Sequence, residues 1–326
     1  MKNFRVAVLF AMLGTLISPS PSQAEYITKP EMGSITGAYL ALLVEFGVLE
    51  KIRIAFPDLS PRIEAARDAF QAKFGTAVET IPATIADISP ELGGSTAGIA
   101  DKALQKSDEA TNRAKAEAFL STFEGYAKGD IDPASLKKTL LSWQYRQNPI
   151  QEMRDGFTDT LTVKEITQDR TLNVTITHPL SWEISADNPN LTDNPNPAVT
   201  IQSDAGDGIA GMIILRRPHV GDTGAVASDL EASIPGAKNV KTYDGRVGGY
   251  PAAIITMDRE TNSDGLELTF REAIGAIPAD PETLIEVLTF VFLPRTRAGE
   301  MDREWARFQP LFEAMLKTVE ITPEPK

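Results

Sequence analysis

The 326-residue chain contains no cysteine and only two histidines. Without cysteine there can be no disulfide framework, no thiol nucleophile and no cysteine metal site. A bacterial lipoprotein needs a cysteine to acylate directly after its signal segment, so a lipid anchor of that kind is excluded as well. Stability must come from packed cores, and a chain of this length is long enough to build two of them.

The motifs that usually reveal nucleotide binding or hydrolysis are also missing. No G-x-x-x-x-G-K-[ST] loop occurs, and no G-x-G-x-x-G follows a predicted strand. The segment Gly93–Ala97 (GGSTA) comes nearest to the G-x-S-x-G nucleophile elbow, but it lacks the last glycine and does not follow a strand. We interpret it as a connector. The sequence predicts no cofactor.

The two histidines are the first candidates for acid–base work. His178 precedes Pro179 at a predicted strand end, and His219 follows Pro218 in a predicted loop. Neither lies in an H-x-x-H or H-E-x-x-H pattern or another common ligand spacing. We therefore predict surface or structural roles for both.

The N-terminus has the three-part order of a secretory signal. Lys2 and Arg5 precede an apolar run from Val6 to Ile17, and a Ser/Pro-rich stretch ends at Ala24. The run is too short to span a bilayer, which needs about 20 apolar residues. We predict cleavage after Ala24 and a soluble periplasmic or secreted product. No later segment is expected to cross a membrane, because the most apolar one, residues 284–293, is short and carries a glutamate.

The chain is acidic, with 45 Asp and Glu against 32 Lys and Arg, and the net charge is −13. Cleavage after Ala24 removes two of the bases and none of the acids, which takes the net charge to −15. Such a charge repels phosphate backbones and anionic lipid surfaces. We therefore predict neither nucleic-acid binding nor direct membrane insertion, and the spread of the charge is typical of a solvated surface.

Residues 25–160 are rich in Ala, Leu, Lys and Glu and predict an all-helical domain. The first helix, residues 35–56, is apolar on nearly all sides, so it is either central to its bundle or covered by a partner. We favour the bundle centre. Proline and glycine residues divide the rest of this region into predicted segments. These are a helix from 61 to Gly75, a weaker helix at 78–88 interrupted by Pro82, a loop at 89–95, a helix at about 97–126 and a last helix at 133–147.

Residues 161–326 have a different character, with β-branched residues alternating with polar ones, and predict an α+β domain with a mostly antiparallel sheet. The near-continuous apolar run at 284–293 is expected to form a central strand. A final amphipathic helix at 301–319 should be kinked or broken at Pro310. The other predicted elements are strands at 172–185 around Pro179, 198–202, 210–215, 240–247, 252–258 and 266–271, and a short helix at 225–234.

The second domain, from about residue 171 to 322, resembles the PsbP-like group, which includes the PsbP subunit of photosystem II and the periplasmic DcrB proteins. The likeness rests on the opening THPLSWEIS with its P-x-x-W start, the short helix ASDLEASI, the strand through GGYPAAIITMD and the closing helix EWARFQPLFEAMLKTV. The resemblance implies an α/β/α sandwich and an accessory or binding role. It implies no catalytic residues, and it does not reach the helical domain.

Oxygen-rich loops raise the question of a calcium site, because calcium takes six to eight oxygen ligands. No twelve-residue EF-hand spacing fits, and Asn and Asp are ordinary turn formers. A calcium site is thus the weaker interpretation. Its candidate residues are Asp187, Asn188, Asn190, Asp193, Asn194, Asn196, Asp204 and Asp207.

Two further groupings remain. The carboxylate pairs Asp108-Glu109 and Asp130 with Asp132 are interpreted as solvated surface rather than glycosidase acids, which must face each other across a cleft. Basic residues in the acidic second domain form either a solvated rim or a surface for an acidic partner. They are Arg216, Arg217, Arg295, Arg297, Arg303 and Arg307.

The sequence therefore predicts an exported, non-enzymatic accessory protein of the bacterial envelope that binds another envelope protein. Two alternatives stay open. One is a periplasmic hydrolase whose carboxylates converge only in the fold. The other is a carrier of lipid or another small ligand, with the apolar first helix lining its cavity. The oligomeric state is not encoded in any pattern that we can identify.

Overall fold

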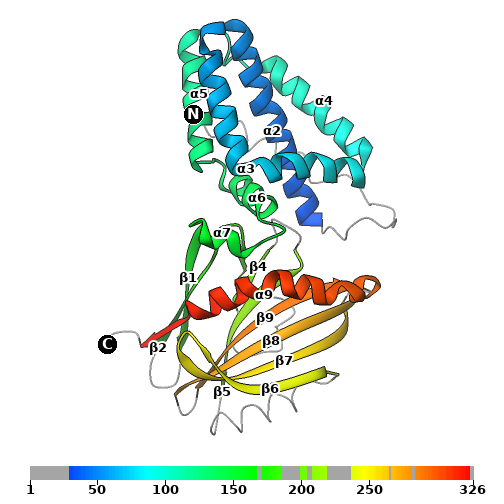
Figure 1. The fold of residues 1–326 in the computed structure, drawn as a ribbon, viewed down its shortest axis with the longest axis vertical. Coiled ribbons are helices and arrows are strands. Elements are labelled where there is room, and N and C mark those ends of the chain that lie inside the picture. The colour runs from blue at the N-terminus through cyan, green and yellow to red at the C-terminus, as the bar shows by residue number, and fades with distance from the viewer. Residues whose placement is uncertain are drawn as a thin grey trace. The chain divides into compact units, whose positions relative to one another are not determined.

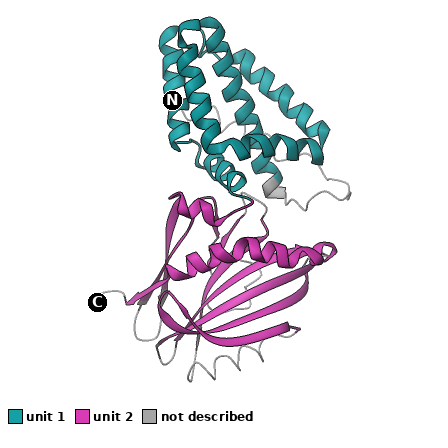
Figure 2. Ribbon diagram, viewed as in Figure 1, with its two compact units in different colours: residues 1–146 teal, residues 147–326 magenta. Residues whose placement is uncertain are grey.

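The computed structural model describes residues 29–166, 171–185, 199–203, 208–218, 236–263, 266–280 and 283–323. The chain forms two compact units, Met1–Arg146 and Gln147–Lys326 (Figure 2). The division falls before the predicted boundary at residue 160. The reason is that the short helix α7 (Ile150–Arg154) packs against α9 (Met301–Lys317) and β2 (Thr171–Pro179), both elements of the second unit.

The first unit is all-helical (Figure 1). The apolar helix α2 packs against the four other α-helices described in this unit, as expected of a helix at the bundle centre. The aromatic rings of Phe46, Phe70 and Phe123 meet edge-on or tilted, with centroids 5.2–5.9 Å apart. The elements are α2 (Lys29–Ala55), η1 (Pro57–Leu59), α3 (Ser60–Ile88), α4 (Pro90–Lys106), α5 (Arg113–Lys128) and α6 (Ala134–Gln144).

Several predicted helix boundaries in this unit are wrong. The predicted division near Gly75 corresponds to a kink in α3, where Phe74 leaves helical geometry, but no break follows at Pro82 and the helix runs on to Ile88. Residues 89–95 do not form a loop, because the Ser89 side chain accepts a hydrogen bond from the Leu92 N–H and caps α4. The helix predicted at 97–126 is two helices, α4 and α5, separated at residues 107–112.

The segment Met32–Ala55 of α2 is long and apolar enough to cross a membrane, and a stretch of 18 residues within it has a mean hydropathy of 1.6. The expectation that no segment after residue 24 meets these criteria is therefore wrong. Forty-four per cent of the segment is buried inside the protein. A central helix of a packed bundle passes the same test, since both environments select apolar side chains.

The second unit contains two antiparallel sheets, which confirms the predicted α+β fold class. Strands β1, β2 and β10 form a three-stranded sheet, and the others form a seven-stranded sheet in the order β3-β4-β5-β9-β8-β7-β6. As predicted, the apolar strand β9 lies in the middle. The strands are β1 (Thr158–Ile166), β2, β3 (Glu183–Ser185), β4 (Val199–Gln202), β5 (Ala210–Pro218), β6 (Lys238–Val247), β7 (Tyr250–Ser263), β8 (Leu266–Asp280), β9 (Thr283–Pro294) and β10 (Glu320–Pro323).

One face of the large sheet packs against α9, whose apolar stripe of Phe308, Leu311, Phe312 and Met315 is buried (Figure 1). Helix α9 continues through Pro310, so the predicted break there is wrong. The opposite face carries a second, smaller cluster around Ile255, Ile274 and Leu284. The helix predicted at 225–234, which would be the other layer of the α/β/α sandwich, lies outside the described residues.

Candidate functional site

The four arginines that the sequence offers as a possible partner surface lie in two pairs at opposite ends of β9. Arg216 and Arg217 pair in register with Ile285 and Leu284 at its beginning. Arg295 and Arg297 lie in η3 (Arg295–Glu300), which follows its last residue. Ten strand residues at about 3.3 Å each separate the two pairs by roughly 30 Å. The structure thus separates the two pairs along the strand, and their contact with an acidic partner stays a prediction.

Arg295 and Arg297 differ in their surroundings. Arg295 makes an exposed ion pair with Glu267 at 3.3 Å, a contact that solvent screens strongly. Arg297 instead donates two hydrogen bonds to the Glu300 carboxylate, from Nε at 3.2 Å and Nη2 at 2.8 Å. These hydrogen bonds hold the pKa of Glu300 below its ordinary value.

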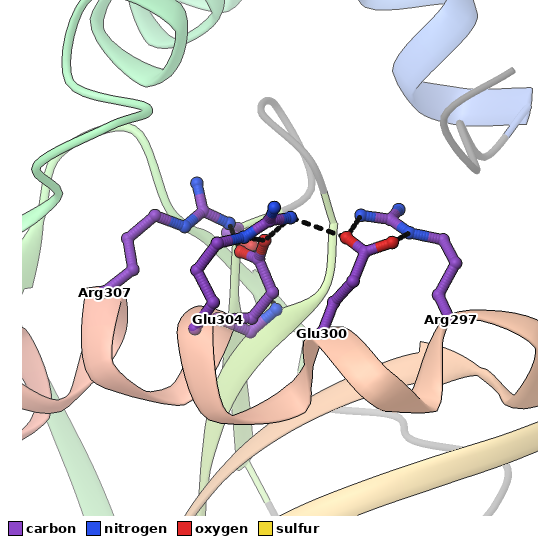
Figure 3. Close-up of polar contacts among 7 residues, drawn as sticks. Arg297, Glu300, Glu304 and Arg307 are labelled. Atoms are coloured by element: carbon purple, nitrogen blue, oxygen red, sulfur yellow. Dashed lines mark hydrogen bonds and ion pairs between the residues drawn. The ribbon is translucent and has the colours of Figure 1, made fainter.

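Glu300 belongs to a series of ion pairs that runs from η3 into the first turns of α9 and that we call the arginine–glutamate ladder, consisting of Arg297, Glu300, Arg303, Glu304 and Arg307. Arg303 bridges the two carboxylates, at 2.5 Å from Glu300 and 2.7 Å from Glu304. Arg307 lies 2.7 Å from Glu304. Spacings of three and four residues place all five on one side of the helix, where Figure 3 shows the labelled side chains together.

The ladder runs from the protein core to solvent. Glu304 is 6% exposed and belongs to the buried stripe of α9. The Arg307 guanidinium lies 4.4 Å from the centroid of the Phe308 ring, a cation–π arrangement. The Arg303 side chain, by contrast, is 67% exposed. An anionic group of another molecule can therefore reach Arg303, while Glu304 holds the inner end of the ladder in place.

A buried polar group lies where β2 meets β3. The Glu152 carboxylate of α7 accepts hydrogen bonds from the Ser181 backbone N–H at 2.8 Å and from Ser181 Oγ at 2.7 Å. Glu152, Ser181 and His178 are each at most 2% exposed. Burial raises the pKa of Glu152 to about 7, although the Ser181 hydrogen bonds act in the opposite direction.

His178 has the structural role that the sequence predicts. Its Nδ1 lies 2.8 Å from the Pro179 carbonyl oxygen, inside the same turn. Glu152, Ser181 and His178 are residue types that serve acid–base catalysis, but here the hydrogen bonds between Glu152 and Ser181 fasten the β2–β3 turn to α7. His219, the other histidine, lies outside the described residues.

A second carboxyl with a raised pKa lies in the helical unit. Burial and the nearby carboxylate of Glu109 raise the pKa of Glu45 in α2 to about 7. Burial of Tyr126, together with the nearby carboxylate of Glu45, raises the pKa of Tyr126. Sequence reasoning missed Glu45 and Glu152. A glutamate in the middle of an apolar helix is a signal for the first, but no local pattern marks the second.

The other sequence candidates do not form a site in the described part of the chain. All four aspartates of the proposed calcium loops, Asp187, Asp193, Asp204 and Asp207, lie outside it. No three His, Asp or Glu residues gather there in an arrangement that suits a metal ion. Asp108 forms an exposed ion pair with Lys115.

No family model and no curated protein matches the chain. Among solved structures it is similar to LpqN of Mycobacterium tuberculosis, which is described as involved in cell envelope biogenesis. The sequence identity is 14% and the TM-score is 0.29, and the match covers 52% of this chain and 94% of LpqN. It is also similar to PA94 of Pseudomonas aeruginosa, a protein of unknown function and putative regulator, at 20% identity and a TM-score of 0.24 over 51% and 99%. TM-scores this low assign neither family nor function, so the PsbP-like resemblance stays a prediction.

Proposed function

We propose that the mature chain is an exported, non-enzymatic accessory protein that binds another protein of the cell envelope. The supporting observation is how the second unit distributes its polar groups. Glu152, Ser181 and His178, which suit acid–base chemistry by type, are enclosed and hold a turn. The ladder instead brings a charged side chain, Arg303, to solvent on a rigid helix.

This arrangement suits recognition because the ladder is held in position before a partner arrives. Each exposed guanidinium is oriented by a carboxylate on the same helix, so little side-chain freedom is lost on binding. Charge complementarity of this kind mainly sets partner choice and association rate. The compartment rests on the signal-like segment before Ala24, which lies outside the described residues.

The experiment is a capture from detergent-solubilised cell envelope with immobilised mature chain, residues 25–326. We expect one protein to be retained in near-stoichiometric amount, and its retention to fall when Arg303→Glu reverses the charge at the outer end of the ladder. Glu50→Gln, an exposed change in the helical unit, is the control. Turnover on a hydrolase panel that disappears with a single substitution, without retention of any partner, would contradict the proposal.

The location is tested separately. The intact mass of the protein recovered from the periplasmic fraction should correspond to a chain that begins at Glu25. A mass that includes residues 1–24 would show that the segment is not removed, and the export part of the proposal would then be wrong.

A further inference from the structure

The outer edge of β6 is an open end of the seven-stranded sheet. The strand is ten residues long and, among the strands of the described residues, pairs with β7 alone, whereas β3, at the other end of the sheet, has three residues. Residues 241–244 are all exposed, including Tyr243 at 54%. A long edge of this kind presents unpaired backbone N–H and C=O groups to solvent.

The hairpin that joins β6 to β7 shows which residues present those groups. Gly248 and Gly249 form a two-residue turn with positive φ at both positions, so Val247 and Tyr250 close it as a hydrogen-bonded pair. Hydrogen-bonded and non-hydrogen-bonded pairs alternate along an antiparallel ladder. Counting back from Val247, the outward backbone groups belong to Arg246, Asp244 and Thr242.

The start of β6 is closed to pairing by an irregularity. The register with β7 shifts between Lys238 and Lys241, and Asn239 there has a φ of 55°. Bulges and lysines are common devices that protect sheet edges from random association. Seven residues, 241–247, remain in unbroken register with β7. The available edge is thus short and defined in position.

The charge of this edge is opposite to that of the protein. Strand β6 carries Lys238, Lys241 and Arg246 against a single acid, Asp244, in a chain of net charge −13. Lys238 is engaged by Glu260 at 2.8 Å. Within the described residues, Lys241 has no carboxylate at ion-pair distance. The cationic edge therefore favours an acidic occupant.

We propose that residues 241–247 of β6 bind an extended, acidic segment of another protein, which joins the sheet as an additional strand. The inference rests on the proposed function and adds the edge of β6 to the ladder as a surface that the partner contacts. Backbone hydrogen bonds to Thr242, Asp244 and Arg246 supply affinity, and carboxylates beside Lys241 and Arg246 select the partner. A second copy fits less well, since antiparallel pairing about the middle of 241–247 places Asp244 opposite Asp244.

Proline offers a selective test, because it removes a backbone donor and is tolerated where the N–H of an edge strand faces solvent. Thr242→Pro deletes an outward donor while sparing the β6–β7 hydrogen bonds, and Thr242→Ala is the matched control that keeps it. The probe is a fluorescein-labelled peptide of alternating threonine and glutamate, about eight residues long. Binding to the full mature chain is measured by fluorescence anisotropy.

We expect the acidic peptide to bind wild-type protein and Thr242→Ala, and to bind Thr242→Pro about tenfold more weakly. Lys241→Glu should weaken it as well, and a peptide with lysine in place of glutamate should not bind. Far-UV circular dichroism and thermal unfolding must show that the proline variant is folded. If it is not, Arg246→Pro is compared with Arg246→Ala instead, because both variants lose the Arg246 charge and only the proline variant also loses the outward N–H.

Equal affinity of the proline and alanine variants, or no binding of the acidic peptide, would overturn the inference. So would a concentration-dependent dimer that Thr242→Pro abolishes in sedimentation, because the occupant would then be a second copy. These results are distinct from failure of the proposed function. A captured envelope protein that is retained equally by wild type and Thr242→Pro leaves the function standing and removes β6 as its site.

Discussion

Ser181 donates two hydrogen bonds to the carboxylate of Glu152, and this pair joins the first helix of the second unit to the turn between β2 and β3. The next residue, Trp182, packs with ring centroids 6.3 Å from both Phe308 and Phe312 of α9. The pair therefore fixes the position of a tryptophan in the core. Its strength depends on pH because the carboxylate is buried.

The first prediction concerns the pH dependence of stability. Glu152 has an ordinary pKa of 4.5 in the unfolded chain and about 7 in the folded protein. Between these values the folded protein keeps a proton that the unfolded chain has released, so the free energy of unfolding falls as pH rises from about 4.5 to about 7. The contribution is on the order of 3 kcal/mol, and it should be absent in Glu152→Gln.

Urea unfolding of both proteins at several pH values between 4.5 and 8 provides the measurement. The difference between wild type and Glu152→Gln isolates this residue from Glu45, which titrates in the same range. Ser181→Ala is a useful companion, since loss of its Oγ hydrogen bond should raise the pKa of Glu152 further. Parallel stability curves for wild type and Glu152→Gln would contradict the assignment.

The sequence predicts a helix or strand best where a clear apolar pattern corresponds to a single buried face of that element. The stripe of Phe308, Phe312 and Met315 predicts α9, and the apolar run of β9 predicts a central strand. Proline and glycine indicate helix ends at Pro82 and at Gly93-Gly94, but helices run through both positions. There Ile81 and Ile85 before the boundary and Leu92 after it are buried, so packing of neighbouring turns outweighs the cost of glycine and proline within helices.

The candidate site was only partly predictable for a related reason. The spacing of Arg297, Arg303 and Arg307 does mark a helix face, and the ladder lies there. Glu304 is buried between Arg303 and Arg307 because α9 packs on the sheet at that point. No local sequence pattern indicates this packing. The contact between Glu152 and Ser181 joins positions 29 residues apart, and strand register alone separates Arg217 from Arg295.

A second prediction concerns Glu45 in the helical unit. Burial and Glu109 raise its pKa to about 7, so above that pH the folded bundle must hold a charge that the unfolded chain carries without penalty. Glu45→Gln should therefore raise the Tm at pH 8 and leave it nearly unchanged at pH 5. The measurement is thermal unfolding followed by circular dichroism at about 222 nm, where helices give a strong negative band.

Glu50→Gln is the control for this comparison, because Glu50 is exposed and its pKa is lowered by the hydrogen bonds from Arg53. It should lower the Tm slightly or not at all at pH 8. An equal increase for both variants would mean that a general reduction of negative charge, rather than the burial of Glu45, is responsible.

A third prediction compares the two glycines of the β6–β7 turn. A Cβ on Gly248 would lie 1.7 Å from the Val319 carbonyl oxygen, whereas a Cβ on Gly249 meets nothing within 4 Å. Both have positive φ, so alanine at either position costs about 1 kcal/mol of backbone strain. Gly248→Ala should be markedly more destabilising in urea unfolding. Equal losses would show that strain alone requires these glycines.

The last prediction concerns the inner end of the ladder. Glu304 is buried between Arg303 and Arg307, and Glu304→Gln removes the carboxylate that both guanidinium groups face. Because the Arg307 side chain is only 13% exposed, water replaces that carboxylate poorly, and we expect a loss of about 3 kcal/mol. Glu300→Gln, at a side chain that is 36% exposed, should cost less than about 1 kcal/mol. Denaturant unfolding with unchanged m-values measures both.

Added salt should reduce the effect at Glu300 more than at Glu304, since solvent ions screen exposed pairs more strongly than buried ones. Similar losses at the two positions, with similar salt dependence, would mean that Glu304 does not anchor the ladder.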